Sequence, residues 1–471
     1  MDVLIQVKDF AIVLLALGFL IFVAYRGFSV ILFAPVAALL AVLLTQPADV
    51  LPAYSGLFMA KMVGFVQNYF PVFMLGAIFG KVIELAGFSR SIVAAVFRLL
   101  KPEYAVLSIV LVCNLLTYFG VSLFVVVFAV YPFAAEAFRQ GNMPKRLIPG
   151  TIALGAFSFT MDSLPGTSQI QNLIPAPFFG TTGFAAPYLG IVGAMFILAA
   201  GITYLTWRVR SAAAAGEGYG EGHTNEPEPV PDTALVHPLV ALFPLVLVGI
   251  LNFVFTYYVV PDLYGEQNTL VLPGLDHPIE TKIAAVRAVW ALELSLLIGI
   301  LSVVVLGYRN VAARFADGTK AAIGGAMLAA MNTASEYGFG SVISVLGGFL
   351  TVKSYLAAIP NPLINEAISV TTLAGVTGSA SGGLSIALAA LADQFKAAAD
   401  AAHIPYEVLH RVASMASGGM DTLPHNGAVI TVLAVTGLTH RQSYKDIFAI
   451  TCLKTLGVFV VIATYYLTGL V

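Results

Sequence analysis

Two short segments of this chain place polar residues that could do chemistry inside apolar surroundings. The letters MDSLPG begin at Met161 and MDTLPH begin at Met420, so an aspartate, a hydroxyl and a proline recur in the same order. In a bilayer, a carboxylate at the centre costs roughly 2.5–3.5 kcal/mol on insertion scales, so it should face a cavity and be paired, protonated or ion-bound. Burial disfavours the charged form. Asp162 and Asp421 are therefore candidates for proton coupling.

A proline in each segment should interrupt the helix around it. Pro165 and Pro424 lack a backbone N–H and would clash with the preceding turn. Non-helical backbone at membrane depth is tolerated where it lines a cavity, and helix N-termini aimed at such a break favour an anion. The aspartates could also simply cap the helices that follow. Gly166, His425 and Asn426 follow the two prolines, and Ser163 and Thr422 supply the hydroxyls, so these five residues are candidates for substrate binding.

A second pair of similar segments has the same sequence separation as the two aspartates. The two aspartates are 259 positions apart, and the same shift carries Ser122, in YFGVSLF, onto Ser381, in TGSASGGLSIAL. Gly378, Ser379 and Ser381 could bring the backbone close to a ligand and coordinate a carboxylate or a cation, or they could form a small-residue packing face. Paired Gly/Pro-interrupted segments in two halves of a membrane chain indicate a transporter whose binding site lies between two repeats.

A third acid stands alone in an apolar stretch. Glu336, in MNTASEYGFGSV, is the only charged residue between Lys320 and Lys353. It is a further candidate for proton coupling, and the alternative is a structural pair with a basic group elsewhere.

The amino-acid composition indicates that most of the chain lies in a lipid bilayer. Of its 471 residues, 59% are hydrophobic and 10% are charged, whereas soluble domains carry about 25% charged residues. We therefore expect an all-α polytopic membrane protein. Spanning helices are predicted near 10–25, 28–46, 103–118, 121–138, 185–208, 236–258, 285–307 and 454–470. Broken or re-entrant segments are predicted at 62–87, 147–183, 321–348, 367–391 and 412–437.

A hydrophilic segment divides the chain into halves. Residues 211–235 are rich in Gly, Pro and Glu and are predicted to form a flexible aqueous linker between membrane repeats at 1–210 and 236–471. Basic residues precede the linker, whereas the loop 260–280 has neither Lys nor Arg. This asymmetry predicts a cytoplasmic linker and an external 260–280 loop.

Several function classes find no support in the sequence. The net charge is −2 and no basic run suggests nucleic acid. The two cysteines give no metal spacing and no disulfide framework. Neither HExxH nor GxSxG occurs, so we expect a carrier without an enzymatic activity, a metal or a cofactor other than its coupling ion. An integral-membrane enzyme and a channel remain as alternatives.

Three segments resemble the gluconate permease (GntP) family of the ion-transporter superfamily, in its 3-hydroxybutyrate permease-like branch. They are FTMDSLPGTSQIQNLIPAPFFGTTGFAAPYLGIV from Phe159, TGSASGGLSIAL from Thr377 and MASGGMDTLPHNGAVITVLAVTGLTHRQSYKDIF from Met415. The resemblance covers the membrane part of the chain. It implies secondary transport of small organic anions such as gluconate or 3-hydroxybutyrate, commonly with protons, by a cell-membrane protein.

The resemblance also implies an architecture and a set of site residues. Two inverted repeats, hairpins meeting at the membrane midplane, homodimers and elevator-like movement are expected. The corresponding site residues are Asp162, Ser163, Pro165, Gly166 and Thr167, then Asp421, Thr422, Pro424, His425 and Asn426, with Ser122, Gly378, Ser379 and Ser381 at the broken helices. Because the first half has GVSLF where the second has GSASGG, the halves are expected to contribute unequally.

These observations lead to the hypothesis that the protein is a symporter for a small monocarboxylate and protons. The proton would be taken up by Asp162, Asp421 or Glu336. The nearest alternative is a sodium-coupled carboxylate symporter of the same architecture, in which hydroxyls and hairpin carbonyls form cation sites.

Overall fold

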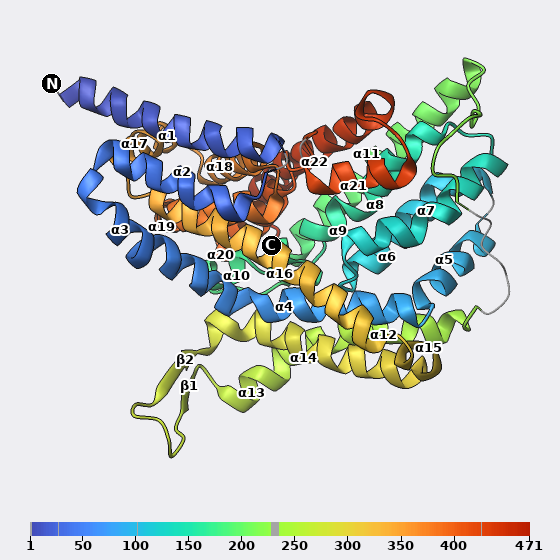
Figure 1. The fold of residues 1–471 in the computed structure, drawn as a ribbon, viewed down its shortest axis with the longest axis horizontal. Helices are drawn as coiled ribbons and strands as arrows, with labels where there is room; N and C mark the ends of the chain where they lie inside the picture. The colour runs from blue at the N-terminus through green and yellow to red at the C-terminus, as the bar shows by residue number, and fades with distance from the viewer. Residues whose placement is uncertain (1, 27, 101, 228–234, 425) are drawn as a thin grey trace.

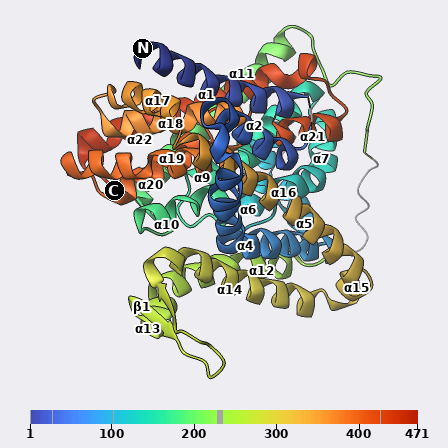
Figure 2. The ribbon, with the colours of Figure 1, turned by 60° about the vertical axis from the view of Figure 1, so that its left-hand side comes forward.

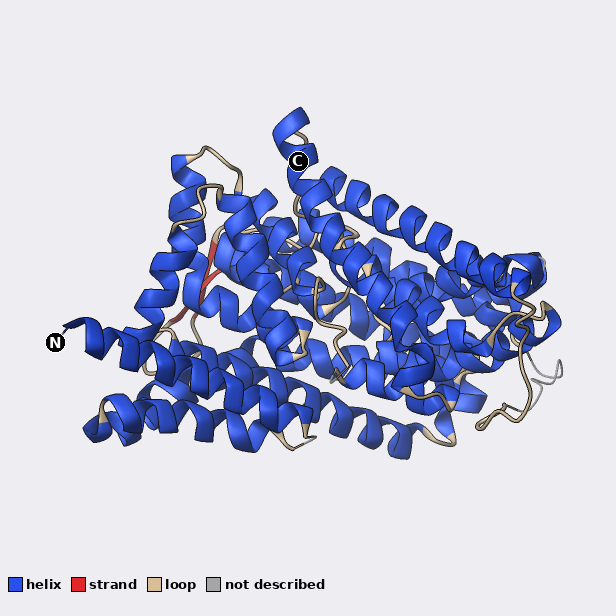
Figure 3. Cartoon of the chain, turned by 90° about the horizontal axis from the view of Figure 1, so that it is seen from above, coloured by secondary structure: helices blue, strands red, loops and turns tan. Residues whose placement is uncertain are grey.

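The computed structural model describes residues 2–26, 28–100, 102–227, 235–424 and 426–471. The protein is mostly helical, and long helices pack side by side over most of its extent (Figures 1 and 3). The all-α prediction misses one feature. The strands β1 (Gln267–Leu270) and β2 (Ile279–Lys282) form an antiparallel hairpin that pairs Gln267 with Lys282 and Leu270 with Ile279. This hairpin projects away from the helices (Figure 2).

Every predicted spanning segment coincides with a helix. These helices are α1 (Asp2–Tyr25), α2 (Val30–Thr45), α6 (Ala105–Tyr118), α7 (Leu123–Gln140), α11 (Pro187–Ala214), α12 (Pro238–Val254), α14 (Ile283–Leu306) and α22 (His440–Thr468). Within the described residues, 5 helical segments are long and apolar enough to cross a membrane. They are Pro47–Leu85, Pro187–Ala214, Pro238–Tyr264, Ile283–Leu306 and His440–Thr468. The segment that begins at Pro47 joins the short helix α3 (Val50–Pro52) and a π-helical turn (Ala53–Phe58) to α4.

The break predicted at 62–87 is wrong as far as Leu85, and the break predicted at 321–348 occurs only near its end, where residues 344–346 form a turn. The helices α4 (Met59–Leu85) and α16 (Phe315–Ile343) are continuous, although Pro71 lies inside α4. They pack against each other along their length (Figure 1). Membrane helices tolerate Pro and Gly because neighbouring helices compensate for the disturbed backbone. The close α4–α16 pairing supplies such a neighbour.

The segments predicted to be broken at 147–183, 367–391 and 412–437 are interrupted, and a further interruption lies just before Ser122 in the first half. In the first half the chain leaves α6 and enters α7 through Gly120, whose φ is +96°. In the second half α18 (Pro362–Thr377) and α19 (Ala380–Ala401) are joined through Gly378, whose φ is +65°. A positive φ favours glycine. The two glycines are 258 positions apart, within one position of the separation between the two aspartates.

The two MD[ST]LP segments form turns next to short helices. The first turn, residues 163–168, follows α8 (Ile148–Ala156) and α9 (Phe159–Asp162). The second turn, described at residues 418–424 and 426, lies between α20 (Tyr406–Ser417) and α21 (Gly427–Thr436). The remaining helices are α5 (Phe88–Leu99), α10 (Pro175–Phe179), α13 (Val260–Tyr264), α15 (Tyr308–Ala312) and α17 (Gly347–Ala357).

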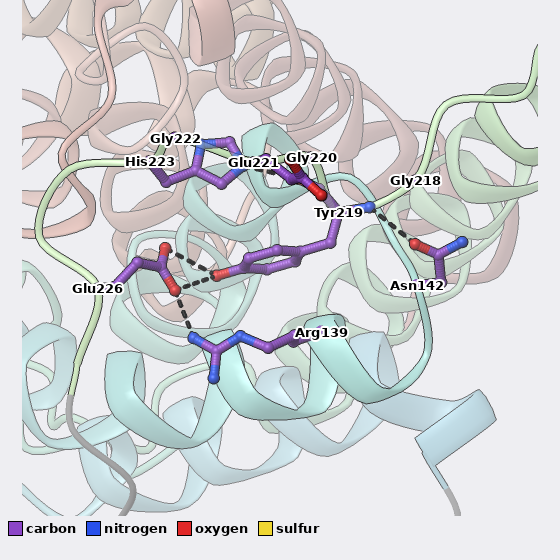
Figure 4. Close-up of a pocket in the computed structure, with 9 residues that line it drawn as sticks. All are labelled: Arg139, Asn142, Gly218, Tyr219, Gly220, Glu221, Gly222, His223 and Glu226. Carbon is purple, nitrogen blue, oxygen red and sulfur yellow. Dashed lines mark hydrogen bonds and ion pairs between the residues drawn. The ribbon is translucent and has the colours of Figure 1, made fainter.

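The hydrophilic segment is more ordered than its composition predicts. Its start, through Ala214, belongs to α11, and residues 215–227 form a docked strap. Lys145, whose side chain is fully buried, donates hydrogen bonds to Thr224 O at 2.9 Å and Glu226 Oε1 at 2.7 Å. Glu226 also pairs with Arg139 and accepts a hydrogen bond from the Tyr219 hydroxyl (Figure 4). The prediction of a flexible linker is therefore wrong for residues 215–227.

The strap ties the first half to the second. Asn225 Nδ2 donates to Ala434 O at 2.9 Å and Thr224 Oγ1 donates to Gly437 O at 3.0 Å, both at the end of α21. Arg146 makes two hydrogen bonds to the Glu217 carboxylate, at 2.6 and 2.7 Å. The strap therefore contacts α7, the 3-10 turn Lys145–Leu147 that precedes α8, and α21.

Replacing Glu226 with Gln should loosen the strap. The change leaves the buried ammonium of Lys145 without its carboxylate partner, and a buried charge without a partner is unfavourable. We expect faster cleavage of residues 216–227 by a protease in limited proteolysis of the purified protein. The matched control is Glu221→Gln, in the same strap and exposed. Equal cleavage rates in the two variants would contradict the contact.

Acidification should release the strap as well. The hydrogen bond from Arg146 holds the pKa of Glu217 below its ordinary value. Burial raises the pKa of Glu226, but the hydrogen bonds from Lys145 and Arg139 outweigh it and the net pKa is lowered. Groups with a depressed pKa stabilise above the unfolded value of about 4.3 and lose that contribution as the pH falls through the folded value. Strap cleavage by an acid-tolerant protease should therefore rise below about pH 4 and stay constant between neutral pH and pH 6.

Candidate functional site

A buried ion pair joins the second turn to the first half of the chain. Asp421 Oδ1 lies 2.7 Å from Lys454 Nζ of α22, and the two side chains are 6% and 2% exposed. Lys454 Nζ also donates a hydrogen bond to Phe157 O at 2.8 Å, in the link between α8 and α9. One ammonium therefore connects the second turn, helix α22 and the approach to the first turn.

The aspartate of the first turn lies at the same centre. Asp162 interacts electrostatically with Lys454 and with Asp421, and its Oδ1 accepts a hydrogen bond from the Ser163 hydroxyl at 3.0 Å. Its Oδ2 rests against Gly418, where a Cβ would overlap it. The structure thus brings together the two aspartates that the repeat placed 259 positions apart.

A buried arginine supports the first turn from the second half. Arg411 of α20 is fully buried, and its Nη1 donates to Asp162 O at 2.9 Å and to Asn172 Oδ1 at 3.1 Å. Its Nε and Nη2 donate to Ala185 O at 3.2 and 2.7 Å. We call Asp162, Asp421, Lys454 and Arg411 the central ion cluster. Its two carboxylates and two cations balance when all four are ionised.

Sequence reasoning missed both cations. Lys454 lies at the edge of the predicted span 454–470, and Arg411 lies between the predicted broken segments 367–391 and 412–437. A usable signal was present in the case of Lys454, because the apolar run around it, AITCLKTLGVFVV, contains no other charge. An ionisable residue inside an apolar membrane segment is a functional-site hypothesis by default.

Most hydroxyl and glycine candidates in the two turns make hydrogen bonds inside the protein. Gly166, at φ +76°, donates its N–H to Gly183 O at 2.8 Å. Thr167 Oγ1 donates to Thr160 O at 2.7 Å, and Thr422 Oγ1 lies 2.5 Å from Thr451 Oγ1. Ser163, Gly166, Thr167 and Thr422 are all buried. In this conformation they shape the turns. His425 lies outside the described residues.

A second polar group forms where α19 and α21 begin. Asn426 Nδ2 donates to Gly378 O at 2.8 Å, and Asn426 Oδ1 caps α21 by accepting from Ala428 N at 2.7 Å. Ser379 Oγ caps α19 by accepting from Gly382 N at 3.0 Å. The N-termini of two helices therefore converge at one contact. Helix N-termini carry partial positive charge and bind anions.

Hydroxyls and one acid complete this group. Ser381 Oγ lies 3.2 Å from Thr333 Oγ1 of α16 and 3.5 Å from Ser379 Oγ. Glu336, also on α16, is 5% exposed, has Ser379 as its polar neighbour and rests against Gly382, where a Cβ would overlap its Oε2. Its Oε2 has no hydrogen-bond partner. We call Thr333, Glu336, Ser379, Ser381 and Asn426 the α19–α21 site. Ser379, Ser381 and Asn426 remain partly exposed.

The first half repeats the geometry without the acid. Tyr118 OH donates to Pro165 O at 2.8 Å, and Ser168 N donates to Tyr118 O at 3.2 Å, so the first break contacts the first turn as the second break contacts the second turn. Ser122, partly exposed, begins α7 without a side-chain cap. At the repeat separation from Glu336 the first half has Ala77, on α4. The two halves therefore differ in chemistry.

We also searched the structure for a metal site and for a large cavity. Among the described residues, no group of three or more His, Cys, Asp or Glu side chains could hold a metal ion. A cavity of about 640 Å³ is lined by strap residues together with Arg139 and Asn142 (Figure 4). None of the candidate site residues lines this cavity. We therefore do not assign the transport site to it, although it is large enough for a small molecule.

The buried pair gives a direct test of the central ion cluster. Replacing Asp421 with Asn leaves Lys454 buried without its partner, and breaking such a pair costs about 3–5 kcal/mol. The reciprocal variant Lys454→Met should destabilise similarly. The double variant removes both charges, so most of the thermal stability should return.

Melting temperatures in detergent, read as a double-mutant cycle, measure this coupling. The matched control is Lys445→Met, an exposed lysine on the same helix. Additive losses in the double variant would contradict the pairing.

Comparison with known proteins agrees with a membrane carrier. No protein-family model matches the chain. The uncharacterized transporter YxjC of Bacillus subtilis (strain 168) is 56% identical over 472 residues, which cover 98% of this chain and 100% of YxjC. The crystal structure of the Alcanivorax borkumensis YdaH transporter is similar in fold, with a TM-score of 0.52 at 14% identity over 87% of this chain and 88% of YdaH. The protein therefore belongs to the same family of transporters as YxjC.

Proposed function

We propose that this transporter is a secondary active symporter that moves a small hydroxy-monocarboxylate together with protons. The observation that carries the proposal is the α19–α21 site, where two helix N-termini meet beside a buried acid. The resemblance to the gluconate permease family supports 3-hydroxybutyrate, gluconate or a similar anion as substrate.

The α19–α21 site offers groups of the right kind for such a substrate. The N-termini of α19 and α21 would stabilise the carboxylate. The amide of Asn426 and the hydroxyls of Ser379 and Ser381 can donate or accept hydrogen bonds, so they suit a substrate hydroxyl as well. These three residues are partly exposed, whereas the residues of the central ion cluster are buried.

Glu336 supplies a physical reason for proton coupling. Its carboxyl lies beside Ser379, where the substrate anion would bind. Two like charges about 4 Å apart repel by about 4 kcal/mol at the effective dielectric of a protein surface. Protonation of Glu336 removes this repulsion, so the anion and the proton favour each other's binding, and this coupling is reciprocal.

The two aspartates suit a different role. Asp421 is paired with Lys454, and Asp162 lies within the same balanced cluster. Protonating either one would leave a buried cation without its counter-charge, which is costly. We therefore assign the proton to Glu336 and a positioning role to Asp162 and Asp421, which hold the two turns in register.

The proposal extends to the membrane arrangement. The repeated broken helices support two inverted repeats with an elevator-like movement. The resemblance to the gluconate permease family supports a homodimer in the cell membrane. The strap and the β1–β2 hairpin lie on opposite sides of the molecule (Figures 1 and 2), which supports a cytoplasmic linker and an external 260–280 loop. Joint loading of the anion and the proton would neutralise the moving part and lower the cost of its crossing.

Sodium coupling is the second candidate, and one observation favours it. The hydroxyls of Thr333, Ser379 and Ser381 and the carboxylate of Glu336 are all oxygen donors, the type of ligand that hard cations prefer. Uptake into proteoliposomes of labelled 3-hydroxybutyrate, gluconate and lactate separates the two. A proton gradient alone should drive accumulation. Accumulation only under a sodium gradient would replace the proton proposal with the sodium one.

The variant Glu336→Gln tests the coupling residue. With the membrane voltage clamped at zero, each coupled proton contributes about a factor of ten in accumulation per pH unit. Glu336→Gln should therefore accumulate about tenfold less per pH unit while it retains substrate counterflow. Asp317→Asn, an exposed acid on the same helix, is the control. Unchanged accumulation in Glu336→Gln would remove Glu336 from the coupling.

A further inference from the structure

A second buried acid has no partner. Glu366 lies on α18, its side chain is completely buried, and neither carboxylate oxygen makes a hydrogen bond. Buried polar groups are nearly always hydrogen-bonded, so each exception calls for an explanation. Glu366 belongs to neither the central ion cluster nor the α19–α21 site.

Among the side chains that the structure describes around α18, none supplies a counter-charge to Glu366. Helices α1, α17, α19, α20 and α22 pack against α18. Among described side chains, the charged or titratable ones on α1, α17 and α19 are partly or fully exposed. The buried ones on α20 and α22 bond elsewhere: His410 to Thr181, Arg411 to the first turn, Asp446 to Arg146 and Arg208, and Lys454 to Asp421.

An unpaired carboxylate in such a place is strongly unfavourable, because burial removes its hydration and nothing replaces it. Glu366 therefore holds a proton in this conformation. Packing alone does not require a carboxyl here. At the repeat separation the first half has Leu107, on α6, the helix that corresponds to α18.

Helix α18 links Glu366 to the proposed substrate site. It ends at Gly378, whose carbonyl accepts the hydrogen bond from Asn426. Glu366 precedes Gly378 by twelve residues, about 18 Å along a helix. Thr371 Oγ1 of α18 also donates to Ala416 O at 3.0 Å, at the end of α20. Substrate binding that displaces Gly378 would therefore move the packing around Glu366.

We propose that Glu366 is a second proton-binding site of the transport cycle, protonated in this conformation and releasing its proton to water when α18 repacks. The proposal rests on the proton-coupled function above and deepens it. With Glu336 as the first site, the cycle moves two protons with each monocarboxylate. Transport is then electrogenic, with one net positive charge per cycle.

The ratio of substrate inside to outside at equilibrium measures the number of protons. The experiment uses the full chain in proteoliposomes, labelled 3-hydroxybutyrate, a gradient of one pH unit, and potassium with valinomycin to hold the voltage at zero. Two coupled protons give about 100-fold accumulation and one gives about tenfold. The wild type should reach about 100-fold.

Two variants locate the second proton. Glu366→Gln should reach about tenfold and keep counterflow. Glu366→Leu, which copies position 107, should behave in the same way and melt at a higher temperature, because it removes a buried polar group without a partner. Glu407→Gln is the control, an exposed acid on the neighbouring helix α20. It should reach the wild-type ratio.

The outcomes separate this proposal from the one it rests on. No proton-driven accumulation by the wild type would overturn proton coupling itself, and this proposal with it. About tenfold accumulation by the wild type would preserve one coupled proton and overturn the second site. If the wild type accumulates substrate about 100-fold and both Glu366 variants reach the same inside-to-outside ratio, the second proton binds at another residue. Loss of the infrared band of a protonated carboxyl in Glu366→Gln would confirm that Glu366 holds a proton.

Discussion

The fold depends on one constraint: a charge placed in an apolar interior must find a partner or lose its charge. Asp421 and Lys454 meet this constraint as a pair at 2.7 Å, and Arg411 meets it with carbonyl and amide oxygens around the first turn. These contacts join segments that are far apart in the sequence. The two turns are held together because neither could carry its charge into the interior alone.

The same constraint divides the polar interior by task. The central ion cluster is balanced and buried, so its groups are suited to hold structure. The α19–α21 site is partly exposed, and Glu336 Oε2 in it has no hydrogen-bond partner. This site is therefore suited to reversible binding of a ligand. The sequence repeat places the same broken-helix scaffold in both halves, but Glu336 and Glu366 have Ala77 and Leu107 as their counterparts. The scaffold is shared and the titratable chemistry belongs to the second half.

The sequence predicted what depends on local pattern. Hydrophobic runs located the spanning helices, and the 259-residue shift located both broken helices and both turns. Predictions from the sequence were wrong where the structure of a segment depends on the segments packed against it. Pro71 suggested a break, but packing of α4 against α16 keeps the helix continuous. The glycine-rich segment suggested flexibility, but buried Lys145 fixes it. The roles of Lys454 and Arg411 depend on contacts across 33 and 249 positions, which no local pattern encodes.

The central claim is that the substrate anion binds where α19 and α21 begin, beside Glu336. A crystal structure with a bromine-substituted short carboxylate bound would locate the anion, because bromine can be identified by its scattering. We expect bromine density within contact distance of the hydroxyls of Ser379 and Ser381 and the amide of Asn426. Density confined to the first turn, around Ser163 and Thr167, would contradict it.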